Sequence, residues 1–226
     1  MIGIIGAMQT EVELLISKIQ SPETKTISGI DFVSGKLCDK DVVVAKCGIG
    51  KVFAALCAQT MILEFGVKLL INTGVAGAIS NELDIGDVAI SDYVVQHDMD
   101  TTAIGDPIGL ISGINVVKIA ADDNISSALC RAAEKCGAKY LVGTVASGDT
   151  FISSRERKNT IGTTFDAVVC EMEGAAIGQV CYVNDIPFCV IRAVSDKADG
   201  SSSMDYMTFV GFAAEKNANI VLEYLR

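Results

Sequence analysis

Short apolar stretches that alternate with helical patterns constrain the fold of this chain more than any other feature. Each stretch is too uniformly apolar to keep one face in water, so it predicts a strand buried on both faces of a sheet. The strands expected on this basis are Ile2–Gly6, Leu69–Asn72, Asp87–Val95, Tyr140–Ala146, Ala167–Cys170 and Phe188–Val194. The pattern therefore predicts an α/β fold, a three-layer α/β/α sandwich around a central sheet.

Two further β-rich stretches, Ile30–Leu37 and Asp41–Cys47, follow each other with no helix between them. Such a pair is typical of antiparallel strands, so we expect a mixed sheet. Helices are expected over residues 9–19, 51–63, 123–136 (with Asp123 or Asn124 as its cap), 174–183 and 206–225. A long loop is expected over residues 101–117. No repeat or linker interrupts the pattern, so residues 1–226 are expected to form one domain.

The composition excludes several classes of protein. Half of the 226 residues are apolar and 20% are charged, which excludes a disordered chain, and the net charge of −10 argues against a nucleic-acid partner. No apolar run approaches the roughly 18 residues needed to cross a bilayer, and Met1–Ala7 lacks the basic residues of a signal peptide. Eight cysteines without a C-x-x-C pair predict reduced, buried thiols rather than zinc ligands, and hence a cytoplasmic protein without a membrane partner.

The single histidine narrows the chemistry that the chain can perform. Any mechanism built on a serine or cysteine with a histidine would have to use His97, in the segment Gln96–Asp100. That segment also contains two aspartates and could bind a metal ion, but a loop histidine in a polar turn is the preferred interpretation. We therefore expect no metal and no cofactor, and we expect carboxylates to carry out proton transfer.

Two glycine clusters fail as phosphate-binding loops, and the first of them, Gly3 to Gly6, provides only one G-x-x-G. In Gly48-Ile49-Gly50-Lys51, a P-loop would need glycine where Ala45 stands and serine or threonine where Val52 stands. The dinucleotide fingerprint fails as well, because its third glycine position is Phe53. Tight turns are the interpretation that remains.

Three acidic residues follow predicted strands. Glu11 comes after the first strand, Glu173 after the strand that ends near Cys170, and Asp196 after the strand that ends at Val194. Ligands of open α/β sheets bind outside the carboxyl ends of the strands, so these acids are candidates for a shared site. Each could instead serve as an ordinary helix cap or first-turn acid.

A set of motifs in order and spacing carries a family resemblance. The motifs are Ile2 to Met8 followed by Glu11, Gly48 to Lys51, Asn72-Thr73-Gly74, Ser147-Gly148-Asp149 with Phe151-Ile152, Glu171-Met172-Glu173 and Arg192 to Asp196. Over essentially its whole length the chain resembles the 5′-methylthioadenosine/S-adenosylhomocysteine nucleosidases of the purine nucleoside and uridine phosphorylase superfamily. The resemblance implies a nucleoside phosphorylase-like fold and hydrolysis of the N-glycosidic bond of 5′-methylthioadenosine, S-adenosylhomocysteine and 5′-deoxyadenosine. Adenine would be released, in methionine salvage.

The resemblance also implies roles for individual residues. Asp196 would protonate the adenine N7, Glu173 would hold the ribose hydroxyls, and Glu11 would activate the attacking water with Arg192 nearby. Phe151 would stack on adenine, the backbone of Ile152 would read the base edge, and Met172 would pack under the ribose. The remaining substrate contacts implied are Met8, Ile49, Val75, Ser195, Tyr206 and Ile104.

Two departures from the family pattern affect this pocket. Val75 stands where relatives can carry serine, and its side chain cannot hydrogen-bond to the catalytic water. The loop that closes the 5′-substituent pocket, often across a homodimer interface, is represented by Thr101, Ile104 and Asp106, which are less aromatic than expected. A homodimer is the assembly that the resemblance implies.

Three alternatives remain open from the sequence. A purine nucleoside phosphorylase would need arginines for phosphate near its first strand, and the chain has none between Met1 and Ala103. A nucleosidase for another 5′-modified adenosine, such as aminodeoxyfutalosine, would keep the same acids. A silent nucleoside-binding protein would have no use for a water-activating Glu11.

Overall fold

The apolar strands of the chain form one mixed sheet in the computed structural model, which describes residues 1–226. The strands are β1 (Ile2–Gly6), β2 (Gln20–Ile27), β3 (Ile30–Leu37), β4 (Lys40–Lys46), β5 (Leu69–Ala78), β6 (Val88–Gln96), β7 (Lys118–Ala120), β8 (Tyr140–Ser147), β9 (Ala167–Glu171) and β10 (Phe188–Asp196). Parallel pairs include β1 with β4 and β5, whereas β2, β3 and β4 form an antiparallel meander. The expected mixed sheet is confirmed.

Five of the strands close into a ring, which the strand pattern alone does not reveal. The neighbours run β10-β6-β8-β9-β5, and β10 also pairs with β5. The β5–β9 contact is short and antiparallel, joining Gly77 to Cys170 and Ala78 to Val169 near the carboxyl ends of both strands. Side chains that follow β5, β9 and β10 therefore meet at one rim, although β9 runs opposite to β5.

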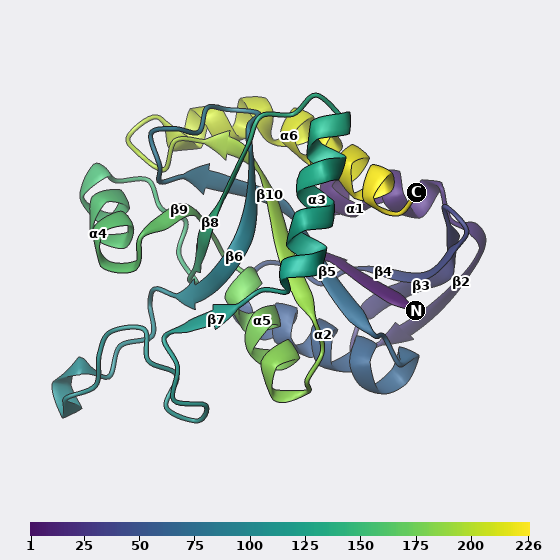
Figure 1. Ribbon diagram of the computed structural model, residues 1–226, viewed down its shortest axis with the longest axis horizontal. Helices are drawn as coiled ribbons and strands as arrows, with labels where there is room; N and C mark the ends of the chain where they lie inside the picture. The colour runs from purple at the N-terminus through teal and green to yellow at the C-terminus, as the bar shows by residue number, and fades with distance from the viewer.

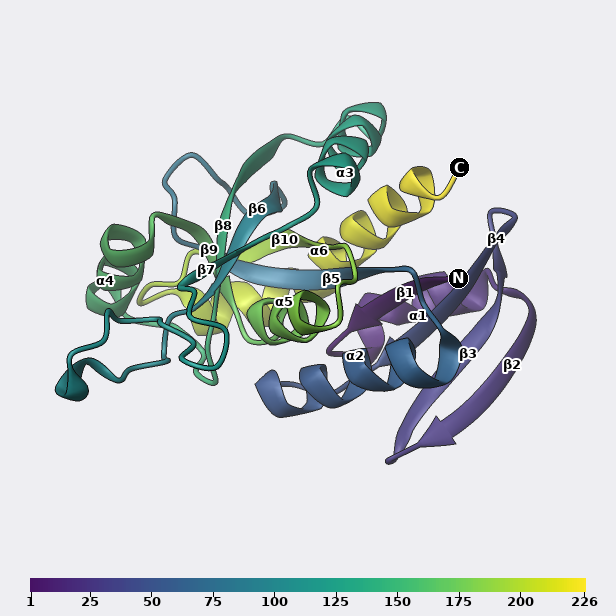
Figure 2. The ribbon, with the colours of Figure 1, turned by 60° about the horizontal axis from the view of Figure 1, so that its bottom comes forward.

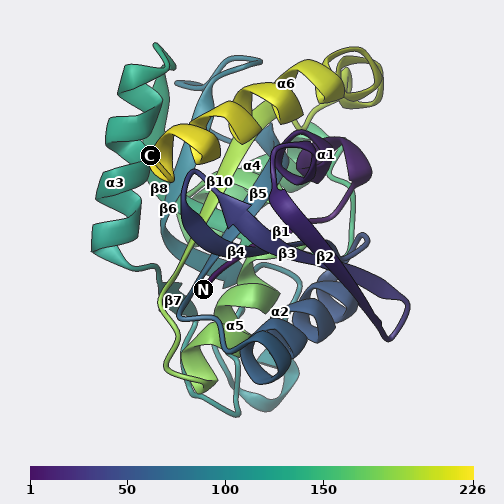
Figure 3. The same cartoon turned by 90° about the vertical axis from the view of Figure 1, so that its right-hand side faces the viewer.

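Helices cover both faces of the sheet, as Figures 1 and 3 show. They are α1 (Gln9–Ser17), α2 (Lys51–Phe65), α3 (Asp123–Lys135), α4 (Arg155–Phe165), α5 (Gly174–Val183) and α6 (Ser202–Tyr224), with a short 3-10 turn at Thr102–Ile104. Helices α1, α3 and α6 pack on one face, α2 and α5 pack on the other, and α4 packs against β8 and β9. The predicted three-layer arrangement is thereby confirmed.

Three elements escaped the sequence analysis: the three-residue strand β7, and β2 and α4, whose apolar signal is weak. Strand β2 is an exposed edge strand with Pro22 and no buried residue, and α4 buries only Ile161 and Phe165. The predicted N-cap of α3, Asp123 or Asn124, was wrong by one or two positions. The cap is Asp122, whose carboxylate accepts hydrogen bonds from the Asn124 and Ile125 amides.

The core is continuous and contains most of the cysteines. One cluster of 57 buried apolar residues joins the helices to the sheet. Five of the eight cysteines are buried, but Cys136 is exposed, so the prediction of buried thiols was wrong for that position. None of the helices combines the length and the apolar character that crossing a bilayer requires.

One buried amide joins α6 to the strands that support the rim. The Asn217 Nδ2 donates to Thr73 Oγ1 (2.9 Å), to the Gly74 carbonyl (3.1 Å) and to the Ile191 carbonyl (2.9 Å). Because Asn217 is fully buried, its removal leaves those acceptors without solvent to replace it.

We expect Asn217→Ala to lower the free energy of unfolding by about 2–3 kcal/mol, the sum of a lost buried hydrogen-bond donor and a small cavity. Denaturant unfolding followed by circular dichroism measures this change. Asn219→Ala, at an exposed position two residues further along α6, is the control. Equal stability of the two variants would contradict the prediction.

Candidate active site

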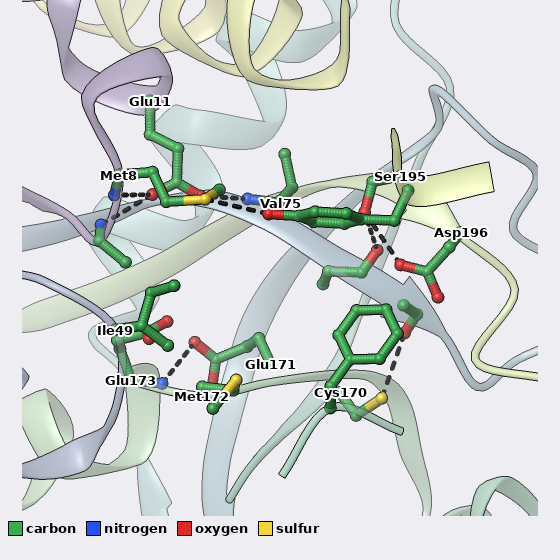
Figure 4. Close-up of a pocket in the computed structure, with 15 residues that line it drawn as sticks. Met8, Glu11, Ile49, Val75, Cys170, Glu171, Met172, Glu173, Ser195 and Asp196 are labelled. Atoms are coloured by element: carbon green, nitrogen blue, oxygen red, sulfur yellow. Dashed lines mark hydrogen bonds between the residues drawn. The ribbon is translucent and has the colours of Figure 1, made fainter. Parts of the chain in front are cut away.

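A cavity of about 300 Å³ opens where the carboxyl ends of β1, β5, β9 and β10 meet. Figure 4 shows Met8, Glu11, Val75 and Ser195 along one side of it and Glu171, Met172 and Glu173 along the other. The complete lining is Ala7, Met8, Glu11, Ile49, Val75, Ala76, Gly77, Phe151, Cys170, Glu171, Met172, Glu173, Ser195, Asp196 and Tyr206. The volume is within the range of small-ligand pockets.

Glu11 is fixed by backbone amides at the start of α1. Its Oε2 accepts hydrogen bonds from the amides of Ala7 (2.7 Å) and Met8 (2.9 Å), and its Oε1 accepts one from the Val75 amide (2.9 Å). Burial raises the pKa of Glu11, while Arg192 and these three amides act to lower it. The carboxylate therefore has a fixed orientation and one free direction, toward the cavity.

Glu173 lies across the cavity from Glu11, at the N-terminus of α5. Its Oε1 accepts a hydrogen bond from the Gly50 amide (2.8 Å), and its Oε2 lies 3.4 Å from the Nη2 of Arg192. Burial raises the pKa of Glu173 to about 7, against the opposing effect of Arg192, and Glu171 adds to the increase. Near neutral pH this side chain is therefore poised between its two protonation states.

Glu171 and Arg192 form a buried ion pair beneath Glu173. The Nη2 of Arg192 donates to Glu171 and also to Asn72 Oδ1 (2.5 Å), and its Nη1 lies 4.0 Å from Glu11 Oε1. Glu171 in turn accepts hydrogen bonds from the Ser147 hydroxyl and from the amide of Gly174, the first residue of α5. The Glu171 carboxylate therefore caps the N-terminus of that helix. Arg192 is completely buried behind the cavity wall and lies close to three carboxylates.

Asp196 lies at the end of β10, away from the arginine. Its Oδ2 accepts a hydrogen bond from the Ser195 hydroxyl (3.0 Å), and its Oδ1 accepts one from the Ala198 amide (2.9 Å). Burial raises the pKa of Asp196 and is the largest effect on it, opposed chiefly by these hydrogen bonds. A carboxyl in such a setting is suited to donating a proton.

Apolar side chains complete the cavity. The rings of Phe151 and Tyr206 meet edge to face with centroids 5.6 Å apart, and the Tyr206 hydroxyl donates to Met8 Sδ (3.0 Å). Ile49 and Val75 line the cavity between these groups and the acids. A planar ring and an apolar substituent would both find contacts here.

Most of the residues proposed from the sequence come together in this cavity, and three lie elsewhere. Arg192 lies behind the wall, and Ile152 is buried next to a smaller hollow that shares Phe151 and Asp196 with the main cavity. Ile104 is 81% exposed and does not line the cavity of its own chain.

Sequence reasoning missed Glu171 as a member of the site. It lies in the quoted motif Glu171-Met172-Glu173, but its part in holding Arg192 and capping α5 depends on how β9 and β10 pack. His97 is buried against Gly148 rather than lying in an open polar turn, and burial lowers its pKa. It does not line the cavity, and no group of three or more His, Cys, Asp or Glu side chains is arranged to bind a metal ion.

The electrostatics of the cavity are acidic. Four carboxyl groups line it, from Glu11, Glu171, Glu173 and Asp196, and no lysine, arginine or histidine does. The one nearby cation, Arg192, is already engaged by Glu171. A neutral or cationic ligand is therefore favoured over an anionic one.

Comparisons with known proteins agree on one family. The model of the phosphorylase superfamily matches residues 1–226. The chain is 41% identical to a 5′-methylthioadenosine/S-adenosylhomocysteine nucleosidase of Shewanella sediminis, over 99% of this chain and 98% of that protein.

Solved structures of the same kind superpose closely. The Neisseria meningitidis nucleosidase in complex with methylthio-immucillin-A has a TM-score of 0.95 at 36% identity, over 99% of this chain and 97% of that one. A Helicobacter pylori protein described as a futalosine hydrolase has a TM-score of 0.94 at 33% identity, over 99% and 96%.

The buried ion pair generates a stability prediction. We expect Arg192→Met to lower the free energy of unfolding by about 3–5 kcal/mol, because Glu171 would keep a buried charge without a partner. Adding Glu171→Gln should recover part of the loss, since it removes that charge. Denaturant unfolding of both variants measures this, with Arg131→Met, at an exposed position on α3, as the control. If Arg192→Met were as stable as the control, the prediction would be wrong.

Proposed function

The chain belongs to the phosphorylase superfamily and, within it, to the 5′-methylthioadenosine/S-adenosylhomocysteine nucleosidases, and we propose how its cavity carries out their reaction. It is an N-glycosyl hydrolase that cleaves the bond between adenine and the ribose of these nucleosides. The reaction must protonate the leaving base, stabilise an electron-poor sugar and direct a water molecule to the anomeric carbon.

The acidic lining of the cavity is the observation that best separates hydrolysis from phosphorolysis. A phosphorylase binds a phosphate dianion, which requires cationic side chains at the nucleophile position. Here Glu11 occupies the first turn, and no basic residue lines the cavity. An ionised Glu11 would repel phosphate, whereas a water molecule can donate a hydrogen bond to it.

Asp196 is proposed as the general acid. Its carboxyl and the ring of Phe151 both line the main cavity, where the base would lie against the aromatic ring, and Ile152 lies beside them at the smaller hollow. The raised pKa of Asp196 favours the protonated form needed to donate to adenine N7. Ser195 holds the carboxyl in position through its hydroxyl.

Glu173 and Glu11 are proposed to act on the sugar and the water. An ionised Glu173 can accept hydrogen bonds from the ribose hydroxyls and place negative charge near the developing cation. Glu11, held by three amides, can accept the proton of the attacking water. Arg192 favours the ionised form of both carboxyl groups, against the burial that raises their pKa values, although it does not line the cavity.

The apolar groups are proposed to accept the rest of the substrate. Met172 would pack under the ribose, while Met8, Ile49, Val75 and Tyr206 would contact the 5′-thioether. The likeness to a futalosine hydrolase makes aminodeoxyfutalosine a second candidate substrate, and 5′-deoxyadenosine a third. Because 5′-methylthioadenosine retains the sulfur of methionine, methionine salvage is the metabolic role that we propose.

Adenine release from 5′-methylthioadenosine tests these assignments. We expect free methylthioribose and adenine at the same rate with or without added phosphate, measured chromatographically. Asp196→Asn should reduce kcat by about 10²–10⁴-fold, the usual contribution of a general acid, while adenine still stabilises the protein against heat. Asp185→Asn, at an exposed position, should retain full activity. A sugar 1-phosphate product, or near-normal turnover by Asp196→Asn, would overturn the mechanism.

We propose that the protein forms a homodimer through the outer face of α2 and α5, which lie side by side in Figures 2 and 3. Large apolar side chains are exposed there, namely Val52, Phe53, Leu56 and Leu63 on α2 and Tyr182 and Val183 on α5. A solvent-exposed patch of this kind is typical of a protein interface. Ile104, exposed on its extended loop, would then close the cavity of the neighbouring subunit.

We expect Leu56→Glu to convert the dimer to a monomer, because it places a charge in the centre of this apolar patch. Light scattering after size exclusion measures the mass, and KM for 5′-methylthioadenosine should rise if Ile104 completes the neighbour's cavity. Ser127→Glu adds the same charge at an exposed position of α3, on the other face of the sheet. A wild-type monomer would refute the proposal.

Residues 1–226 are proposed to act as one domain, because a single sheet and one main core cluster include elements from both ends of the chain. The eight unpaired cysteines support a cytoplasmic location. A single cooperative unfolding transition would support one domain. Cell fractionation would test the cytoplasmic location.

A further inference from the structure

Three loops next to the cavity are joined by a closed ring of hydrogen bonds that the mechanism above does not use. The Lys51 Nζ donates to Asp98 Oδ1 (2.7 Å), Asp98 Oδ2 accepts from the Asp149 amide (2.9 Å), and Asp149 Oδ1 accepts from the Lys51 amide (2.8 Å). Each residue belongs to a different loop, after β4, β6 and β8 respectively. The ring therefore fixes the relative positions of three segments far apart in sequence.

The ring contains one ion pair and lies near the protein surface. The side chains of Lys51 and Asp98 are 18% and 26% exposed, and Asp149 is an exposed residue that accepts a backbone hydrogen bond rather than pairing with a cation. Burial acts to raise the pKa of Asp98, but Lys51 and the Asp149 amide outweigh it and lower that pKa. Gln96, at the end of β6, accepts a further hydrogen bond from Lys51 Nζ (3.1 Å) and donates to Gln179 on α5 (2.7 Å). Because the ring is closed and is joined to α5 through Gln96, its geometry is more constrained than that of a single exposed ion pair.

Two of the tied loops contribute walls and a hydrogen bond to the cavity. Gly50, directly before Lys51, donates its amide to Glu173, and its φ of 100° is a conformation that favours glycine. A Cβ at this glycine would lie 3.0 Å from Asp149 Oδ1, so the two loops are in close contact. Ile49 and Phe151, which line the cavity, flank the ring in sequence.

We propose that Asp98 is a positioning residue for the hydrolysis, acting through Lys51 and Asp149 to aim the Gly50 amide at Glu173 and to hold Phe151 at the mouth of the cavity. The proposal rests on the role assigned to Glu173 above. Asp98 does not line the cavity, so its effect on the reaction is indirect.

The charge state of Glu173 is the property that the ring controls. The charged and titratable groups around Glu173 are Arg192, Glu171, Glu11, Cys47 and Tyr206. Burial and the neighbouring acids raise the pKa of Glu173, whereas Arg192 and the Gly50 amide lower it. Misdirecting the Gly50 amide removes one of these stabilising contacts to the ionised form, so the pKa must rise further.

The test is the pH dependence of kcat/KM for 5′-methylthioadenosine. In the wild-type enzyme kcat/KM should increase as pH rises through about 7, as Glu173 ionises. Asp98→Asn weakens the ring and should move this acidic limb to higher pH by roughly one unit, so that kcat/KM at pH 7 falls by about fivefold and recovers at higher pH. Lys51→Met breaks the ring from another loop and should shift the limb in the same direction, which keeps the test open if Asp98→Asn folds poorly.

Two controls separate the possible outcomes. Asp100→Asn, at an exposed position two residues further on, should leave the limb in place. An equal loss of rate at every pH in Asp98→Asn and Lys51→Met, or no shift in either, would overturn the positioning role. Glu173→Gln should abolish the limb, and a limb that persists in Glu173→Gln would refute the role of Glu173 itself, whatever Asp98 does.

Discussion

The buried pairing of Arg192 with Glu171 is the interaction on which the site depends. A fully buried guanidinium is costly to desolvate, so it persists only where carboxylates and carbonyls surround it. Arg192 donates hydrogen bonds to Glu171 and to Asn72 on β5. Its guanidinium also lies within 4.0 Å of a carboxylate oxygen of Glu173 and of Glu11. Glu171 also caps α5, so one ion pair joins β5, β9, β10 and a helix at the floor of the cavity. Without this cation, three carboxylates would be buried with no compensating charge.

The same cation acts on some carboxyl groups of the cavity more than on others. Arg192 acts to lower the pKa values of Glu11 and Glu173, against the burial that raises both. At Asp196 the effects that oppose burial are chiefly hydrogen bonds. One cavity therefore holds carboxyl groups in two different electrostatic environments, as an acid and a base in one reaction require. The division follows from β10 itself, because Arg192 and Asp196 are four residues apart on a single strand.

The sequence allowed the fold class to be predicted and three acids that line the cavity to be singled out, because both depend on local patterns. Buried strands are uniformly apolar, and Glu11, Glu173 and Asp196 each follow such a strand closely. What could not be predicted depends on long-range packing: the closure of five strands into a ring and the engagement of Glu171 by Arg192. The polar edge strand β2 and helix α4 were missed because neither buries enough apolar surface to produce a periodic signal.

Helix α2 connects the chemistry of the cavity to the surface of the protein. Gly50, the residue directly before the helix, donates its amide to Glu173, and Lys51, the first residue of the helix, joins the three loops. The first two turns also expose Val52, Phe53 and Leu56, which belong to the proposed dimer face. The N-terminal end of α2 is therefore shared by the contacts that orient Glu173 and by the surface through which we propose that two subunits meet.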